Sequence, residues 1–252
     1  MDAVIPRLIF GEGTSEACWQ AWLQSHPLPA VDAVDLLADS RTVHVVAPHP
    51  DDEILACGGL IRQMHRLGAG IHVIAVTDGE ASHPQSRLWT AAQLAGIRTH
   101  ESEQALAQLG VPATRSRLAV PDGEANAREH ELAERLAECF APGDMVIVPW
   151  RLDGHPDHEA AGRAGLAAAQ GRGCRGFEAP IWGWHWADPR DDSFPWQAAV
   201  ALALDDSDLQ AKRRAVRQFR SQLEPDPTTG SAPILPAFAL ARMLRPYEVL
   251  LR

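Results

Sequence analysis

The sequence predicts an α/β fold in which a mostly parallel sheet carries helices on both faces. Short apolar runs typical of buried strands alternate with longer stretches that have helical spacing, and this order favours parallel strand pairing. Glycines end the helical stretches, as at Gly68 and Gly110, and Val111 and Pro112 follow the second. The chain has 252 residues, 46% of them hydrophobic, which suits one well-filled core. We therefore expect a single domain over residues 1–252.

The first forty residues form a lead-in segment that we expect to pack against the main domain, with Trp19 and Trp22 on a short helix. The alternation of strands and helices begins after it. The expected strands are residues 43–47, 71–77, 118–120, 145–149 and 198–204. The expected helices are residues 54–67, 90–109, 126–140, 158–170 and 207–222. Four tryptophans crowd residues 182–196, where we expect core packing or a dimer contact more than stacking on a sugar.

Composition excludes several classes of function. The formal net charge of -10 argues against a surface that follows nucleic-acid phosphates. The N-terminal residues hold an early acid and an early proline, which is not the pattern of a secretory signal, and no apolar run is long enough to span a bilayer. The cysteines are scattered without a CxxC pair, as reduced thiols would be, at Cys18, Cys57, Cys139 and Cys174. We expect a cytoplasmic protein, and its oligomeric state is not indicated.

Two short stretches rich in acids and histidines carry most of the functional signal. They are Ala47-Pro48-His49-Pro50-Asp51-Asp52-Glu53 and Gly154-His155-Pro156-Asp157-His158-Glu159. Each comes after an apolar run that is typical of a buried strand. Loops at the carboxyl ends of the strands in an open α/β sheet converge on one crevice. The two stretches can therefore share one site.

Three residues of these stretches fit a catalytic zinc site. Such a site takes three protein ligands drawn from histidine and carboxylate, and it keeps one position for water. His49, Asp52 and His158 meet this requirement. A hard ion such as magnesium would recruit more oxygen ligands and fewer imidazoles, so we expect Zn²⁺, with Fe²⁺ as the alternative.

Four neighbouring residues have candidate roles beside the metal. Asp51 is the candidate general base for the attacking water. His155 stands one helical turn before His158, and when protonated it could stabilise an oxyanion or donate a proton to the leaving amine. Glu53 and Asp157 are candidate outer partners that orient ring N–H groups.

At these residues the sequence resembles the PIG-L/LmbE family of zinc-dependent de-N-acetylases, whose members carry an HPDDE motif after the first strand and a later HPDH motif. Both motifs match without a gap, and the resemblance covers roughly residues 42–252. It implies a Rossmann-like fold and removal of acetyl groups from N-acetylglucosamine units in glycolipids, thiol-sugar precursors or antibiotics. The resemblance also implies that His49, Asp52 and His158 are the zinc ligands. It implies that Asp51 is the base and that His155 stabilises the oxyanion.

A variable stretch from Asp78 to Arg87 follows the second expected strand, so it should line the same crevice. Asp78 and Arg87 are the candidates for binding sugar hydroxyls or an attached phosphate. The stretch looks like that of a bacterial subgroup associated with surface-polysaccharide or glycolipid synthesis.

We therefore expect a hydrolase that releases acetate from an N-acetylated amino sugar, either a small molecule or a glycolipid. An alternative in the same class is an amidase for another amide, such as a thiol-sugar conjugate. A nucleotide-binding α/β protein is disfavoured because HPDDE, and not a glycine-rich phosphate loop, follows the first strand. A non-catalytic metal-stabilised module is disfavoured because it would leave Asp51 and His155 without a task.

Overall fold

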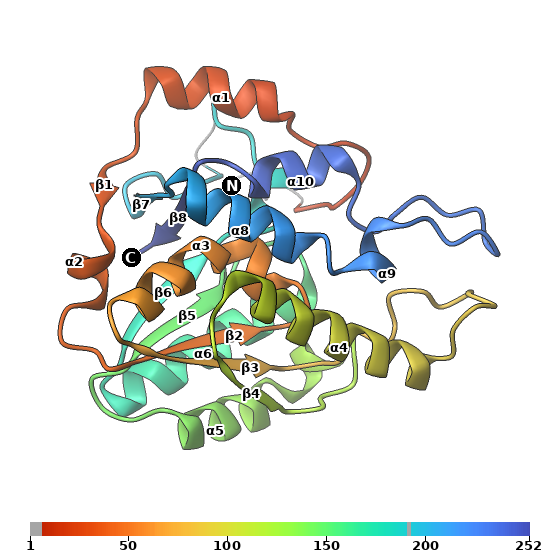
Figure 1. The fold of residues 1–252 in the computed structure, drawn as a ribbon, viewed down its shortest axis with the longest axis horizontal. Helices are drawn as coiled ribbons and strands as arrows, with labels where there is room; N and C mark the ends of the chain where they lie inside the picture. Colours follow the sequence, from red (N-terminus) through yellow and green to blue (C-terminus); the bar gives the residue numbers. More distant parts are fainter. Residues whose placement is uncertain (1–6, 191–192) are drawn as a thin grey trace, which may run out of the picture.

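The computed structural model describes residues 7–190 and 193–252, and one sheet lies at the centre of this part of the chain (Figure 1). Its strands are β1 (Ala30–Val31), β2 (Thr42–Ala47), β3 (Gly70–Ala75), β4 (Thr114–Arg117), β5 (Met145–Pro149), β6 (Arg175–Ala179), β7 (Ala199–Ala203) and β8 (Tyr247–Leu251). They lie in the order β1-β7-β8-β6-β5-β2-β3-β4. Among the described strands, β8 alone runs antiparallel to its neighbours. The expected mostly parallel sheet is confirmed.

Helices cover both faces of the sheet. The longer helices are α1 (Glu16–Ser25), α3 (Asp52–Arg66), α4 (Ala91–Leu109), α5 (Glu129–Cys139), α6 (Pro156–Arg172) and α8 (Asp206–Val216). The shorter ones are α2 (Ala33–Leu37), the 3-10 helix η1 (Ala125–Arg128), α7 (Gly183–Trp186), α9 (Arg220–Leu223) and α10 (Ala237–Met243). Figure 1 shows α3 and α8 on one side of the sheet and α5 on the other. The α/β fold with two helical layers is therefore confirmed.

Side chains of the central strands alternate between two apolar cores. Val43 and Val45 of β2 belong to the core that contains α3 and α4, whereas Val46 belongs to the core that contains α5 and α6. Successive side chains of a strand point to opposite faces, so a strand buried on both faces is apolar throughout. This explains why these strands could be predicted from unbroken apolar runs.

The expected strand over residues 118–120 is wrong, because β4 lies at Thr114–Arg117. Its sequence, Thr-Arg-Ser-Arg, is polar, and β4 is the edge strand beside β3, so it needs no apolar side chains on both faces. Leu118 and Val120 still donate backbone N–H groups to Ala75 and Val76. The apolar run therefore marks the continuation of the chain beyond the strand.

The expected helix over residues 207–222 is broken into α8 and α9. After Val216 the N–H groups of Gln218 and Phe219 bond to carbonyls three residues back, and Phe219 is fully buried. The chain therefore turns to bury this ring before α9 begins.

β6, β8 and α10 were not expected, and β8 pairs antiparallel between β6 and β7. No helix among the described residues has the length and apolar character needed to cross a membrane.

The N-terminal segment packs on the main body through tryptophans. Trp19 of α1 is fully buried and meets Trp184 edge-on with ring centroids 5.1 Å apart. Trp22 stacks on Trp196 at 3.9 Å. Further along, Ala30 of β1 pairs with β7, so the segment extends the sheet. Trp184 and Trp196 of the tryptophan-rich stretch thus pack against α1, whereas Trp186 stacks on Trp150.

Candidate metal centre

The two motifs meet at the carboxyl ends of two neighbouring strands, β2 and β5. Val45 of β2 lies opposite Ile147 of β5 on one side and Val73 of β3 on the other. The carboxyl ends of these parallel strands are therefore level, and the loops that follow them lie together. The loop after β2 carries His49, and the loop after β5 leads to His158 at the start of α6.

Two histidine nitrogens converge on one carboxylate oxygen. Asp52 Oδ2 lies 3.3 Å from His49 Nδ1 and 3.2 Å from His158 Nε2. One ring nitrogen from each of His49, His155 and His158 lies within 4.8 Å of the others. His158 Nε2 is buried, and its contact with Asp52 Oδ2 is close enough for an ion pair but does not have the geometry of a hydrogen bond. These atoms fit a metal ion that takes nitrogen and oxygen ligands.

The electrostatics of the cluster favour a cation. Burial acts to lower the pKa of His158, but Asp52 and Asp153 outweigh it and raise this pKa to about 9. Burial also acts to lower the pKa of His49. Neighbouring carboxylates outweigh this effect and raise the pKa well above its usual range. The carboxylates around the two imidazoles are Asp52, Asp122, Asp153 and Asp157. A divalent cation can replace the two protons, because metal binding displaces protons from its ligands.

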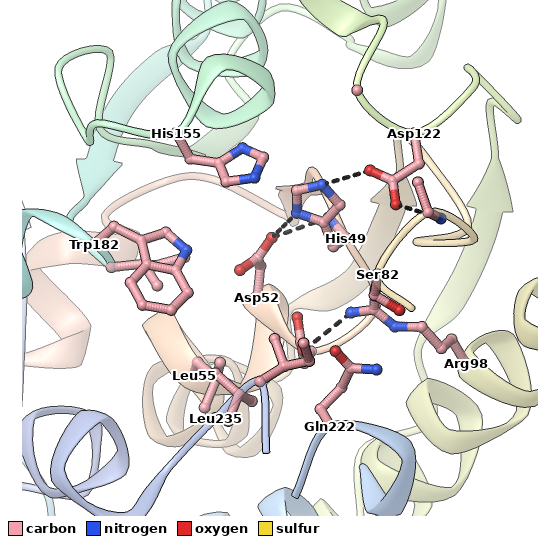
Figure 2. Close-up of a pocket in the computed structure, with 15 residues that line it drawn as sticks. His49, Asp52, Leu55, Ser82, Arg98, Asp122, His155, Trp182, Gln222 and Leu235 are labelled. Carbon is pink, nitrogen blue, oxygen red and sulfur yellow. Dashed lines mark hydrogen bonds and ion pairs between the residues drawn. The ribbon is translucent and has the colours of Figure 1, made fainter. Parts of the chain in front are cut away.

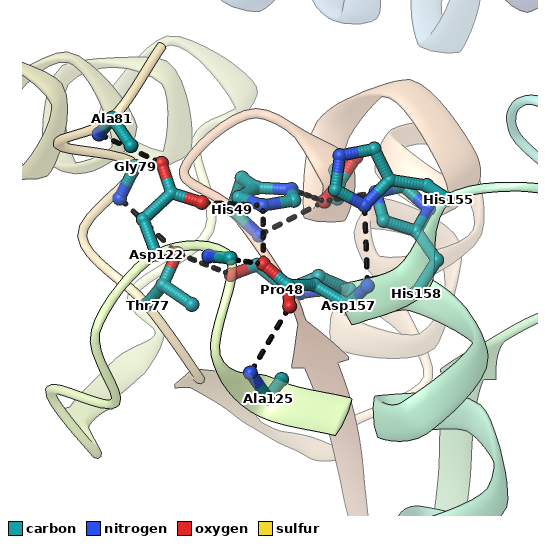
Figure 3. Close-up of polar contacts among 12 residues, drawn as sticks. Pro48, His49, Thr77, Gly79, Ala81, Asp122, Ala125, His155, Asp157 and His158 are labelled. Atoms are coloured by element: carbon teal, nitrogen blue, oxygen red, sulfur yellow. Dashed lines mark hydrogen bonds and ion pairs between the residues drawn. The ribbon is translucent and has the colours of Figure 1, made fainter. Parts of the chain in front are cut away.

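Two of these carboxylates orient His49 (Figure 3). Its Nε2 lies 3.1 Å from Asp122 Oδ1 and 3.4 Å from Asp157 Oδ2. These three side chains are also close enough to hold an ion. However, Asp122 already accepts the N–H of Ala81, and Asp157 that of Gly123. We therefore regard both as partners that direct His49 Nδ1 toward Asp52, a role expected for Asp157.

Asp153 is a further candidate for the site that the sequence does not reveal. It is fully buried, and its Oδ2 lies 2.8 Å from His158 Nδ1. The same carboxylate accepts the N–H groups of Ile181, Trp182 and Gly183. This contact leaves His158 Nε2 free to face the site. An aspartate in a turn is common, and the partners at 181–183 are distant in sequence, so no local signal could find it.

The backbone of Asp51 is strained and held by its neighbours. Its φ of 146° lies where residues other than glycine are rare. Its N–H donates to Glu53 Oε2 at 3.1 Å, and the Ser102 hydroxyl donates to the other oxygen of Glu53. Arg98 donates to the Pro50 carbonyl and to Asp51 Oδ2, at 3.0 and 3.1 Å. We expected Glu53 to orient the N–H group of an imidazole ring. In the structure it accepts the backbone N–H of Asp51 instead.

The two candidate catalytic groups have shifted pKa values. Burial raises the pKa of Asp51 to about 7, although Arg98 acts to lower it, and such a pKa suits a base near neutral pH. Burial, His158 and His49 lower the pKa of His155 to about 3. His155 Nδ1 accepts the N–H of Asp157, so the neutral ring carries its proton on Nε2. The site therefore favours a neutral His155 donor over the protonated form that we expected.

A pocket of about 300 Å³ opens beside these groups (Figure 2). Its polar lining comprises His49, Asp51, Asp52, Ser82, Arg98, Asp122, His155 and Gln222, and its apolar lining includes Leu55, Ile181, Trp182, Ile234 and Leu235. Gln222 is fully buried, and its Oε1 has no hydrogen-bond partner in the described chain. This oxygen is available to a ligand.

The two residues expected to bind substrate do not line this pocket. The carboxylate of Asp78 accepts hydrogen bonds of 2.8 and 2.6 Å from Arg117. Arg87 is exposed, and its backbone N–H donates to Thr228 Oγ1, which joins its loop to residues 224–236. The expected stretch reaches the pocket instead through Ala81 and Ser82.

Comparison with known families agrees with this geometry. Residues 44–169, half of the chain, match the family model described as PIG-L, GlcNAc-PI de-N-acetylase, and the match contains both motifs. The chain belongs to the PIG-L family.

Curated relatives of this PIG-L family protein include two deacetylases. The 1D-myo-inositol 2-acetamido-2-deoxy-alpha-D-glucopyranoside deacetylase of Rhodococcus opacus is 30% identical over 185 residues, which cover 63% of this chain and 59% of the relative. The diacetylchitobiose deacetylase of Thermococcus kodakarensis is 28% identical over 196 residues, covering 75% of this chain and 72% of the relative. The chain thus spans less than two thirds of the Rhodococcus relative.

Solved structures share the fold of this PIG-L family protein. The N,N'-diacetylchitobiose deacetylase of Pyrococcus horikoshii superposes with a TM-score of 0.56 and 22% identity, covering 84% of this chain and 80% of that chain. The deacetylase of the A40926 pseudoaglycone superposes with a TM-score of 0.59 and 22% identity, covering 73% and 84%. At these identities the likeness establishes the fold alone.

Proposed function

We propose that this protein is a zinc-dependent hydrolase that removes the N-acetyl group from an N-acetylated amino sugar. The observation that carries the proposal is the convergence of His49 Nδ1 and His158 Nε2 on Asp52 Oδ2, with Asp51 beside His49 and Asp52 in the lining of one pocket. Membership of the PIG-L family supports it. So do the names of two relatives, deacetylases of an acetamido-glucopyranoside and of diacetylchitobiose.

His49, Asp52 and His158 would hold the metal. Two imidazoles and one carboxylate favour zinc over a hard ion such as magnesium. Zinc bound there would polarise the acetamide carbonyl and lower the pKa of the attacking water.

The side chains around the pocket supply the proton transfers. Asp51 accepts a proton from water as the water oxygen bonds to the acetamide carbon. His155 donates a hydrogen bond from Nε2 to the carbonyl oxygen, where negative charge develops. When the C–N bond breaks, the proton held by Asp51 passes to the leaving amine. The products are acetate and a free amino sugar.

The pocket lining supports a sugar as substrate. Its volume of about 300 Å³ is at the lower end of the range for small-molecule sites. Trp182 offers a flat ring for the apolar face of a sugar. Gln222 Oε1 can accept a hydrogen bond from a sugar hydroxyl, because it has no partner among the described residues.

Acetate release tests the proposal. The panel should contain acetylglucosaminyl-inositol, diacetylchitobiose, an N-acetylated glycolipid and a thiol-sugar amide, each with the zinc-loaded protein, a chelated sample and Asp51→Asn. We expect acetate from at least one acetamido sugar, a rate about 10²–10⁴-fold lower in the variant, and recovery of the chelated sample with Zn²⁺. Cleavage of the thiol-sugar amide alone would favour the amidase, and no cleavage of any substrate would contradict the proposal.

A further inference from the structure

Helix α3, whose first turn carries Asp52, is broken at Cys57. This residue has φ -145° and ψ 26°, outside the helical range. In a continuous helix the N–H of Gly59 would donate to the carbonyl of Leu55. Instead, Gly59 N–H donates to Glu248 Oε1 at 2.8 Å, and Leu60 N–H donates to Glu248 Oε2 at 2.7 Å.

The freed carbonyl on the other side of the break has a partner too. Lys212 Nζ donates to Leu55 O at 2.9 Å and to Glu248 Oε1 at 2.6 Å. Each of these two charged side chains is 1% exposed. A buried ion pair is costly unless further hydrogen bonds satisfy its atoms, and here backbone groups of α3 supply them. The Lys212–Glu248 pair therefore replaces both halves of the missing helical hydrogen bond.

Of the two glycines beside the break, Gly59 makes room for this arrangement, whereas a Cβ on Gly58 would meet only ordinary contacts. A Cβ on Gly58 would lie 3.4 Å from Lys212 Cγ, and a Cβ on Gly59 would lie 2.4 Å from Leu204 Cδ2. Leu204, the residue that follows β7, can approach position 59 this closely only because glycine has no side chain. The break is thus specified by side chains from three separate segments of the chain.

The break separates the first turn of α3 from the rest of the helix. That turn holds Asp52 and Leu55 of the pocket lining, and Asp51 directly precedes it. We propose that Lys212 and Glu248 are positioning residues, whose buried pair sets the direction of this turn and so aims Asp51 and Asp52 at the metal centre. The inference rests on the proposed function for the metal, but the pair's hold on the break can be measured separately.

A matched control lies on the same two helices. Asp208 of α8 accepts hydrogen bonds from Arg62 and Arg66 of α3, and from Gln63 at 2.9 Å. All three donors follow the break. Asp208→Asn therefore weakens the contact between α3 and α8 without changing the groups at the break.

The test compares Lys212→Met/Glu248→Gln with Asp208→Asn. The double variant removes both charges together, so no buried charge is left unpaired. Glu248→Gln alone is the second variant: like the double variant it keeps one side-chain oxygen for Gly59 N–H, but it leaves the buried Lys212 charge unpaired. One measurement is amide hydrogen exchange at Gly59 and Leu60 by NMR. The other is Zn²⁺ affinity by competition with a chelator.

We expect faster exchange at both amides and Zn²⁺ binding weakened about 10- to 100-fold in the double variant, and changes in the same direction in Glu248→Gln, which leaves Lys212 without its counterion. Asp208→Asn should keep wild-type exchange at these amides and wild-type Zn²⁺ affinity. Equal Zn²⁺ affinities in the double variant and in Asp208→Asn, or unchanged exchange, would overturn the inference. A wild-type protein that binds Zn²⁺ but deacetylates nothing would refute the proposed function and leave this test intact.

Discussion

At the scale of single residues, the motifs predict the groups of the candidate metal centre but not the groups that hold them in place. His49, Asp52 and His158 could be predicted because their types and spacing match a metal site and because both motifs follow strands. Asp153 could not, since its partners come from residues 181–183. The contact of Arg98 with Asp51 joins segments 47 residues apart, so spacing within a motif does not reveal it.

Loss of Arg98 should move the pH dependence of the reaction. Arg98 acts to lower the pKa of Asp51, against the larger effect of burial. In Arg98→Gln this pKa should rise, so the base is protonated at neutral pH and the acid limb of kcat/KM moves up by about one pH unit or more. Activity lost at pH 7 should partly return at pH 9. Arg117→Gln is the control, because Arg117 pairs with Asp78 outside the pocket lining. An acid limb that stays in place in Arg98→Gln would contradict this role.

Asp153→Asn should weaken metal binding without removing a ligand. The carboxylate holds His158 Nδ1 at 2.8 Å, and an asparagine is a weaker acceptor for that N–H. Removing an outer partner of a metal-binding histidine costs about 10- to 100-fold in affinity. Competition with a chelator measures this loss. Unchanged Zn²⁺ affinity in a folded variant would mean that Asp153 serves only the turn at residues 181–183.

At the scale of elements, apolar runs predict the strands that are buried on both faces. β2, β3 and β5 each lie between two other strands of the sheet and were expected at nearly their observed bounds. β4 is polar and lies at the edge, so its position was missed. The break in α3 was also missed, because it depends on Lys212 and Glu248, which are distant in sequence. Helix ends marked by glycine were predictable, because a helix commonly ends with a residue in the left-handed region, which favours glycine. Gly110 after α4 has such a φ, 71°.

The contact between α3 and α8 should depend on pH through Asp208. Burial acts to raise its pKa, but hydrogen bonds from Arg66, Arg62 and Gln63 outweigh it and lower the pKa. A carboxyl with a lowered pKa in the folded state adds stability above its unfolded pKa of about 3.9, and that stability is lost as the pH falls through the folded value.

Asp208→Asn should therefore reduce the free energy of unfolding by about 1–2 kcal/mol at pH 7, since Arg66 is partly exposed and the effect is screened. Urea denaturation at pH 7, 5 and 3 measures this difference. The gap between wild type and variant should narrow at pH 3. A gap that stays constant with pH would show that the charge of Asp208 is not responsible.

At the scale of the whole molecule, the N-terminal segment adds to the sheet and to the aromatic core. Trp19 packs against Trp184 and donates its Nε1–H to the carbonyl of that residue at 2.8 Å. Trp184 belongs to α7, and the pocket residue Trp182 directly precedes this helix. The single domain over residues 1–252 remains a prediction, which the unfolding of a variant in this segment can test.

Trp19→Ala should destabilise the whole protein. Trp19 is fully buried, so its loss should lower the free energy of unfolding by about 3–5 kcal/mol, and one cooperative transition should persist if the segment belongs to the domain. Trp22→Ala is the control, because Trp22 is partly exposed and should cost less. Chemical denaturation followed by circular dichroism measures both. A separate early transition in Trp19→Ala would indicate that the segment folds apart from the main body.

We propose that His49, Asp52 and His158 hold one metal ion beside Asp51. The most direct measurement is anomalous diffraction from zinc-loaded crystals, with data above and below the zinc absorption edge. We expect one peak per chain, bounded by His49 Nδ1, Asp52 Oδ2 and His158 Nε2. A peak between His49 Nε2, Asp122 and Asp157, or no peak in this pocket, would contradict it.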